Sequence, residues 1–239
     1  MFLTKLPVKK KSKVLEIGLG SSPHFQSTVL VEKYLFDSSH RWGVGFYKDK
    51  RPVICADASK LPFKNKSFDY IICRNILEHM EEPEIFIKEN ERVAKAGYIE
   101  TPSTFNENLT GYNMHKLLLF NLNNELRIKK RIIPNLLCGD SKLSDFFLND
   151  YHFKRFMMKN NNNFFMVKYF WNDCINYRII KDYEPLIDFD NNEELKLLNK
   201  QISRKKTVCE KVLFKVYSFL YRLRGKIEWE FQKFYVRIN

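Results

Sequence analysis

Short apolar runs, each followed by a polar or glycine-containing segment, recur through the first hundred residues. They lie at residues 14–17, 28–31, 51–57, 67–73 and 96–102. Runs of this length that are rich in β-branched residues predict strands buried in a sheet. Residues 83–93 predict a helix, because Pro83 stands at its start and apolar residues follow at helical spacing. Strands that alternate with helices indicate an α/β fold with a doubly wound, mostly parallel sheet.

The second half of the chain predicts further strands and a helix. Residues 115–130 predict a hairpin, because the Asn-Asn pair in their middle suits a tight turn with positive φ. Residues 144–158 predict a helix with an aromatic face. Residues 164–171 and 174–180 predict two antiparallel strands that pair with each other.

The C-terminal segment is strongly basic. Residues 204–239 contain ten Lys and Arg against three Glu. Residues 208–224 predict a helix with cationic side chains on one stripe and apolar side chains on the opposite side. Such a helix can lie on an anionic membrane surface, or it can pack against its own domain or a second copy. The sequence leaves these alternatives open.

Composition narrows the class of protein. The 239 residues are 44% hydrophobic, as in globular proteins, and the net charge of +13 suits either a phosphate-bearing partner or a solvated basic surface. The five cysteines form no Cys-x-x-Cys pair, which indicates a reducing compartment and argues against zinc. No apolar run reaches transmembrane length and no secretory signal begins the chain. We therefore expect a cytoplasmic protein, with peripheral contact to the inner membrane face through 208–224 as an option.

A glycine turn follows the first predicted strand. The strand ends in Glu-x-Gly-x-Gly, in which Gly18 and Gly20 let the backbone turn sharply toward a helix and approach a ligand closely. A dinucleotide-binding fingerprint would need glycine where Pro23 stands, which argues against a nicotinamide or flavin cofactor. Glu32 ends the second predicted strand and Asp57 the third. Carboxylates in these places accept hydrogen bonds from ribose hydroxyls and similar donors.

Five motifs occur in the order found in one enzyme family. They are Glu16-x-Gly18-x-Gly20, Glu32, Ala56-Asp57-Ala58-x-x-Leu61-Pro62-Phe63, Ser67-Phe68-Asp69 and Leu77-Glu78-His79. On these motifs residues 13–102 resemble the class I S-adenosylmethionine-dependent methyltransferases of the small-molecule type with an Asp-Ala-x-x-Leu-Pro-Phe loop. The resemblance implies a Rossmann-like sheet of seven strands, with an antiparallel pair at the edge and an inserted β-hairpin cap. It divides the chain into a methyltransferase domain at 1–181, with a substrate-side insertion at 103–135, and a basic helical extension at 182–239.

The resemblance implies how the glycine turn would hold S-adenosylmethionine. Gly18 and Gly20, with Ser21 beside them, would pass under the methionine and ribose portions. Glu16 would order the turn near the cofactor's ammonium group. The turn therefore carries the first part of the implied cofactor site.

The rest of the implied cofactor site follows the next three strands. Glu32 would accept hydrogen bonds from the ribose hydroxyls and Asp57 from the adenine amino group, while the Ala58 backbone N–H meets the ring. Arg74 and Asn75 would line the pocket beside the methyl group. The acceptor roles suit the chemistry, because the cofactor groups are donors and a carboxylate accepts two hydrogen bonds.

Three residues are candidates for proton transfer to or from the methyl acceptor. Methyl transfer from a sulfonium needs mainly alignment, and a base only where the acceptor carries a proton. His79 resembles a pocket histidine of the family, and an imidazole titrates near neutral pH. Glu100, at the end of the fifth predicted strand, and His115, in the insertion, are the other candidates. No metal is expected, because histidines and cysteines are scattered along the chain.

The sequence thus predicts an S-adenosylmethionine-dependent methyltransferase acting on a small molecule, a lipid or a glycan. A nucleic-acid methyltransferase is an alternative that the basic charge would suit. Amino-methylating enzymes of that class carry Asn/Asp/Ser-Pro-Pro-aromatic after the fourth strand, where this chain has Cys73-Arg74-Asn75-Ile76. A non-catalytic binding module is the second alternative. The oligomeric state is not predicted.

Overall fold

The computed structural model describes residues 5–18, 20, 22–36, 50–110, 114–131, 165–188 and 190–202. The chain divides into two units, residues 1–202 and 203–239, and the second lies outside the described residues. So do the helices predicted over 144–158 and 208–224. Among the described residues, no helix combines the length and the apolar character needed to span a bilayer.

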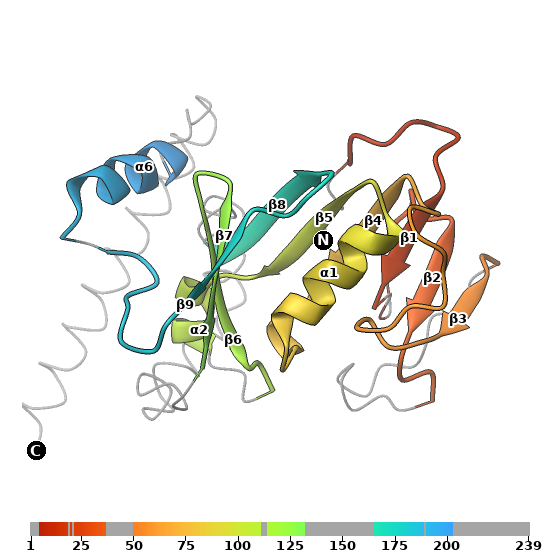
Figure 1. Ribbon diagram of the computed structural model, residues 1–239, viewed down its shortest axis with the longest axis horizontal. Helices are drawn as coiled ribbons and strands as arrows, with labels where there is room; N and C mark the ends of the chain where they lie inside the picture. The colour runs from red at the N-terminus through yellow and green to blue at the C-terminus, as the bar shows by residue number, and fades with distance from the viewer. Residues whose placement is uncertain are drawn as a thin grey trace, which may run out of the picture. The chain divides into compact units, whose positions relative to one another are not determined.

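Six strands form the main sheet of the described part of the chain. They are β1 (Val14–Ile17), β2 (Val29–Glu32), β3 (Val53–Cys55), β4 (Tyr70–Arg74), β5 (Ala96–Pro102) and β8 (Met166–Asn172). Their order across the sheet is β3-β2-β1-β4-β5-β8 (Figure 1), and every neighbouring pair is parallel except β5 with β8. The predicted α/β fold with a mostly parallel sheet is therefore confirmed.

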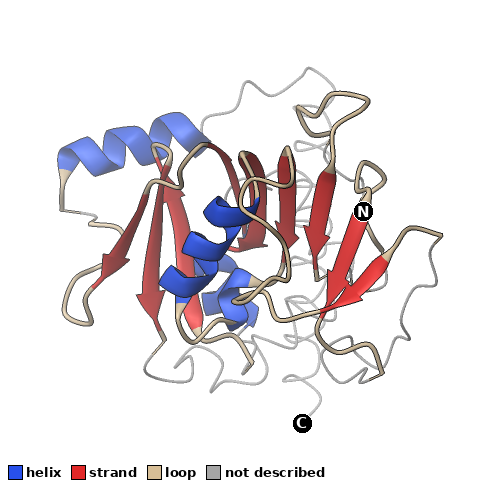
Figure 2. Ribbon diagram, turned by 45° about the vertical axis from the view of Figure 1, so that its right-hand side comes forward, coloured by secondary structure: helices blue, strands red, loops and turns tan. Residues whose placement is uncertain are grey.

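The core lies between the sheet and helix α1 (Pro83–Val93), which covers one face (Figure 2). All four residues of β1 are buried, as the apolar run predicted. On α1, Phe86 and Ile87 are fully buried in the same cluster as Ile71 of β4. Burying each such side chain stabilises the fold by about 1.5–3 kcal/mol relative to leaving it exposed. The helix has the bounds that the sequence predicted.

A second, three-stranded sheet contains the predicted hairpin. Strands β6 (Leu117–Leu122) and β7 (Glu125–Lys130) are antiparallel, and Asn123 and Asn124 between them have φ of 50° and 63°. Two successive positive φ angles identify the tight turn that an Asn-Asn pair favours. The hairpin is therefore present. Its role as a cap over a substrate stays a prediction.

The predicted pairing of 164–171 with 174–180 is wrong. Strand β8 pairs with β5, and β9 (Tyr177–Ile180) pairs in parallel with β7 (Figure 1). The reason lies in the segment between them, which hydrogen bonds to helix α1 and to the residue before β5. The Asp173 N–H donates to Lys95 O at 2.8 Å, and the Ile175 N–H donates to Glu91 Oε1 at 2.6 Å. Because these bonds hold residues 173–175 near Glu91 and Lys95, the chain continues to the second sheet instead of turning back along β8. In the described main sheet, β8 is therefore the antiparallel strand at the edge.

The helix expected directly after the glycine turn is absent from the described residues of that connection, 18, 20 and 22–28. The chain returns at once to the start of β2, where the Thr28 N–H donates to Val14 O at 2.8 Å. Arg51 fixes the loop from outside by donating to His24 O at 2.6 Å and Ser27 O at 3.1 Å. The loop's carbonyl groups thus find partners in side chains rather than in helical hydrogen bonds.

Three short helical elements lie near the second sheet. They are the 3₁₀ helix η2 (Leu77–His79), α2 (Thr104–Thr110) and α6 (Asn192–Ile202). Arg127 of β7 donates from Nη1 and Nη2 to the two carboxylate oxygens of Glu194 on α6, each at 2.8 Å. This paired contact fixes α6 to the second sheet.

Candidate functional site

The glycine turn is organised by the buried carboxylate of Glu16. Its Oε2 accepts hydrogen bonds from the His24 N–H at 2.7 Å and from Ser27 Oγ at 2.5 Å. Its Oε1 forms an ion pair with Arg74 Nη2 at 2.7 Å. Glu16 is fully buried, so these contacts replace the water that its charge would otherwise need. Glu16 thus links the turn to β4, while its implied place near the cofactor's ammonium group stays a prediction.

Both glycines of the turn have left-handed backbones, with φ of +67° at Gly18 and +56° at Gly20. A Cβ atom on Gly18 would lie 2.0 Å from Ile76 Cδ1. A Cβ atom on Gly20 would meet nothing within 4 Å in the described structure, so the backbone there borders open space. A ligand can therefore approach the Gly20 backbone closely. Ser21, the neighbouring predicted contact, lies outside the described residues.

Arg74 and Asn75 follow β4, but they differ in what they contact. Besides its pair with Glu16, Arg74 donates to Ser22 O at 2.6 Å, so it braces the glycine turn from the neighbouring strand. Asn75 has φ of +53°, and its N–H donates to Glu100 O at 2.7 Å. Its side chain is exposed at the carboxyl end of β4. A role for Asn75 beside the methyl group remains a prediction.

Glu32 ends β2 and Asp57 follows the neighbouring strand β3, so both lie at the carboxyl ends of the strands, as the glycine turn does. Glu32, which ends β2, is in register with Cys55 of β3, and Asp57 follows two residues later. Asp57 accepts from the Ser59 N–H at 2.8 Å and pairs with Lys33 Nζ at 2.7 Å. Lys33 and the Ser59 N–H hold the pKa of Asp57 below its usual range, so this carboxylate is ionised at neutral pH.

Glu32 and Asp57 therefore present acceptors next to each other at the carboxyl ends of β2 and β3. Glu32 is 8% exposed and Ala58 5%, whereas the Asp57 side chain is 41% exposed. An adenine amino group at Asp57 would share the carboxylate with Lys33. Ribose hydroxyls and an amino group are donors, so the donor set of S-adenosylmethionine fits these residues.

A second polar group lies at the carboxyl ends of β4 and β5. The rings of His79 and His115 meet edge to face with their centres 4.7 Å apart. His79 Nδ1 lies 3.2 Å from Met114 O, and His115 Nδ1 lies 2.6 Å from Glu107 Oε1. Two of the three residues predicted for proton transfer are thus brought together, although they are 36 positions apart in the chain.

Glu78 belongs to this group, although no role was predicted for it. It is fully buried in η2, and Oε2 accepts from Thr101 Oγ1 at 2.8 Å. Burial raises the pKa of Glu78 to about 7. Glu107, the carboxylate behind His115, is also fully buried and was also missed. In the sequence Glu78 stands between Leu77 and His79, and nothing in that pattern marks it as buried.

Glu100 lies apart from the histidines. Its carboxylate is buried and accepts a hydrogen bond from the Tyr98 hydroxyl on the same strand. Neighbouring strand residues point to opposite faces, so Glu100 and Thr101, the partner of Glu78, point to opposite sides of β5. Glu100 is therefore separated by the sheet from the group that contains His79 and His115.

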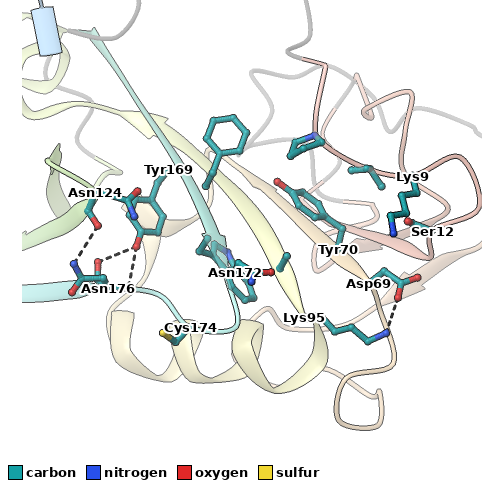
Figure 3. A pocket seen from close by; sticks show the side chains of 15 residues that line it. Lys9, Ser12, Asp69, Tyr70, Lys95, Asn124, Tyr169, Asn172, Cys174 and Asn176 are labelled. Carbon is teal, nitrogen blue, oxygen red and sulfur yellow. Dashed lines mark hydrogen bonds and ion pairs between the residues drawn. The ribbon is translucent and has the colours of Figure 1, made fainter.

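An open cavity of about 840 Å³ lies at the opposite end of the parallel strands, where β4 and β5 begin (Figure 3). Its lining includes Tyr70 and Ala96, the first residues of β4 and β5, together with Asn172 at the end of antiparallel β8. In open α/β sheets, ligands bind outside the carboxyl ends of the parallel strands. We therefore assign the candidate site to the edge with Gly18, Glu32 and Asp57 rather than to this cavity.

Comparison with known proteins shows what parts of the chain are similar to. Residues 38–99 match the family model described as a methyltransferase domain. The chain is also similar to two uncharacterized proteins of Methanocaldococcus jannaschii. One is 34% identical over 80 residues, covering 34% of this chain and 35% of the relative, and the other is 30% identical over 92 residues, covering 36% and 42%. The matches thus span less than half the length of these curated relatives.

Solved structures with similarity to the chain include two S-adenosylmethionine-dependent methyltransferases. That of Thermotoga maritima is 23% identical, covers 39% of this chain and 45% of its own, and has a TM-score of 0.30. That of Methanosarcina mazei is 20% identical, covers 43% and 60%, and has a TM-score of 0.32. Residues 38–99 are thus the part of the chain that is similar to a methyltransferase domain.

Proposed function

We propose that this protein transfers the methyl group of S-adenosylmethionine to a small molecule, a lipid head group or a glycan. The proposal rests on three features that lie next to one another. The glycine turn braced by Glu16, the Glu32 carboxylate and the Asp57 carboxylate follow three adjacent strands at one edge of the sheet. This is the edge at which open α/β sheets bind nucleotide-like ligands.

The residues at this edge divide into a cofactor side and an acceptor side. Gly18 and Gly20 would pass under the methionine and ribose portions, Glu32 would accept from the ribose hydroxyls, and Asp57 with the Ala58 N–H would hold the adenine. The bound cofactor supplies an activated methyl group on a good leaving group. Catalysis by the protein then consists mainly of holding the acceptor in line with that methyl group.

The acceptor side is formed by the residues that follow β4 and β5. His79 and His115 lie here, each fixed by a hydrogen bond from one ring nitrogen. An imidazole held in one tautomer can take a proton from an acceptor hydroxyl or amine when such a proton must be removed. The hairpin β6–β7 follows His115 directly, which is why we place acceptor selection in this segment.

The proposal is tested by calorimetric titration of S-adenosylmethionine into the wild type and Asp57→Ala. We expect binding by the wild type and a loss of about 1–3 kcal/mol of binding free energy in the variant, because the adenine amino group would lose its acceptor. Asp69→Ala is the matched control, because Asp69 lies before β4 at the opposite edge and pairs with Lys95. Equal losses in both variants, or no binding by the wild type, would overturn the cofactor site.

A further inference from the structure

Three side chains on the acceptor side form a set that can ligate a metal ion. Glu78 and His79 lie in η2, and His115 lies just before β6. Each offers one ligand atom, and these three atoms lie within 4.8 Å of one another. The backbone holds the two segments together, because the Lys116 N–H donates to Glu78 O at 2.7 Å.

The hydrogen bonds of the two histidines favour the tautomer used in metal sites. His115 Nδ1 faces a carboxylate oxygen of Glu107 at 2.6 Å, and His79 Nδ1 faces the Met114 carbonyl at 3.2 Å. Both oxygens accept, so Nδ1 carries the proton in each ring and Nε2 carries the lone pair. A carboxylate or carbonyl behind Nδ1 is the usual support of a metal-ligating histidine. Arg131 Nη1 lies 3.9 Å from Glu107 Oε2 and balances the charge of this buried carboxylate.

The buried carboxylate of Glu78 gives a second, independent indication of a ligand. One oxygen accepts from Thr101 Oγ1, while Oε1 is buried and has no hydrogen-bond partner in the described part of the chain. A buried carboxylate oxygen without a partner is costly, and a bound cation would remove that cost. Glu78 is fully buried and stands beside the two imidazoles.

We propose that Glu78, His79 and His115 bind one divalent transition-metal cation, with Glu107 as the residue that positions His115. Two imidazoles and one carboxylate suit zinc, iron or cobalt better than magnesium, which prefers oxygen ligands. Three protein ligands leave a position for water or a substrate oxygen, as in catalytic rather than structural zinc sites. The site lies on the acceptor side, yet its existence does not depend on the proposed methyl transfer.

Cobalt binding tests the proposal without any need for activity. The protein of residues 1–239 is treated with EDTA, exchanged into metal-free buffer and titrated with Co²⁺, whose visible absorption reports coordination by protein ligands. We expect the wild type to develop this absorption up to one equivalent and to lose it when Zn²⁺ is added. Glu78→Gln and His115→Gln should not develop it. Glu107→Gln should bind about 10- to 100-fold more weakly, the range for residues that support a ligand.

Glu81→Gln is the matched control, because Glu81 is a nearby carboxylate whose side chain is 73% exposed and pairs with Lys116. It should bind Co²⁺ like the wild type. Thermal unfolding gives a second measurement: Zn²⁺ should raise the Tm of the wild type and of Glu81→Gln, but not that of Glu78→Gln. Glu78→Gln keeps the size of the side chain, so a folded variant is expected. No Co²⁺ absorption in the wild type, or equal absorption in Glu78→Gln and His115→Gln, would overturn the proposal.

Discussion

The Arg74 guanidinium reaches from β4 to the Glu16 carboxylate of β1, with 2.7 Å between Nη2 and Oε1. Only 10% of the Arg74 side chain and none of Glu16 is exposed. The same guanidinium also donates to Ser22 O within the glycine turn. One side chain therefore joins two parallel strands and the loop that the proposed cofactor would contact.

Arg74→Ala should destabilise the protein, because it leaves the buried Glu16 charge without its cation. Removing one partner of a buried ion pair typically costs about 3–5 kcal/mol. Urea unfolding followed by circular dichroism measures this loss. Lys95→Ala, which breaks the exposed pair with Asp69, is the control and should shift the midpoint far less. Similar shifts in both variants would show that the Arg74 pair is not a structural requirement.

Gly18→Ala and Gly20→Ala should differ, although both glycines have positive φ. A left-handed backbone costs a non-glycine residue about 1–2 kcal/mol at either position. Only Gly18 carries the additional clash, since its Cβ would lie 2.0 Å from Ile76 Cδ1. We expect Gly18→Ala to unfold at lower urea concentration than Gly20→Ala. The double variant Gly18→Ala, Ile76→Ala should then lose less free energy of unfolding than the two single variants lose together. Strictly additive losses would contradict the clash.

Gly97 is covered by the Trp171 indole across the antiparallel pair of β5 and β8. A Cβ on Gly97 would lie 2.5 Å from Trp171 Nε1 and 2.7 Å from Ile71 Cγ2. Gly97→Ala should therefore lower the free energy of unfolding by about 1–3 kcal/mol through overpacking, and it should move the buried indole toward water. A red shift of tryptophan emission, with a lower unfolding midpoint, is the expected result. Unchanged emission and midpoint would mean that the indole can move aside freely.

The contact between Arg127 and Glu194 should make stability depend on pH. Arg127 holds the pKa of Glu194 below its usual range. A carboxylate with a lowered pKa in the folded state contributes stability above its unfolded value of about 4.3, and that contribution is lost as pH falls through the folded value. Glu194→Gln should therefore be less stable than the wild type at pH 7, with the gap closing toward pH 3. Urea unfolding midpoints of both proteins between pH 7 and pH 3 measure this difference in stability. A difference that does not change with pH would exclude the charge effect.

The strands of the main sheet were predictable because each is a short, locally encoded apolar run. β1 and β4 are buried in nearly every residue, and α1 begins at a proline that marks a helix start. The partner of β9 was not predictable in the same way. The sequence of residues 174–180 suits a strand, but the hydrogen bonds of Asp173 and Ile175 to Lys95 and Glu91 decide where it goes. Those contacts are distant in the chain.

The candidate site, too, was predictable from the sequence only in part. The glycines and the carboxylates after β2 and β3 stand at strand ends, so the order of strands alone predicted that they would share an edge. The group of Glu78, His79 and His115 depends on how the segment after β5 folds back beside η2. In the sequence, a glutamate that the fold buries looks the same as a surface glutamate, so Glu78 and Glu107 could not be singled out.

The pairing of β9 with β7 bears on how this protein could exchange parts with its relatives. The second sheet takes two strands from residues before β8 and one strand from residues after it. A segment swap limited to residues 103–135 would deliver the hairpin without the strand that completes its sheet. Recombination that keeps the second sheet intact must therefore move β6, β7 and β9 together, and it must either include β8 or place an additional crossover on each side of β8.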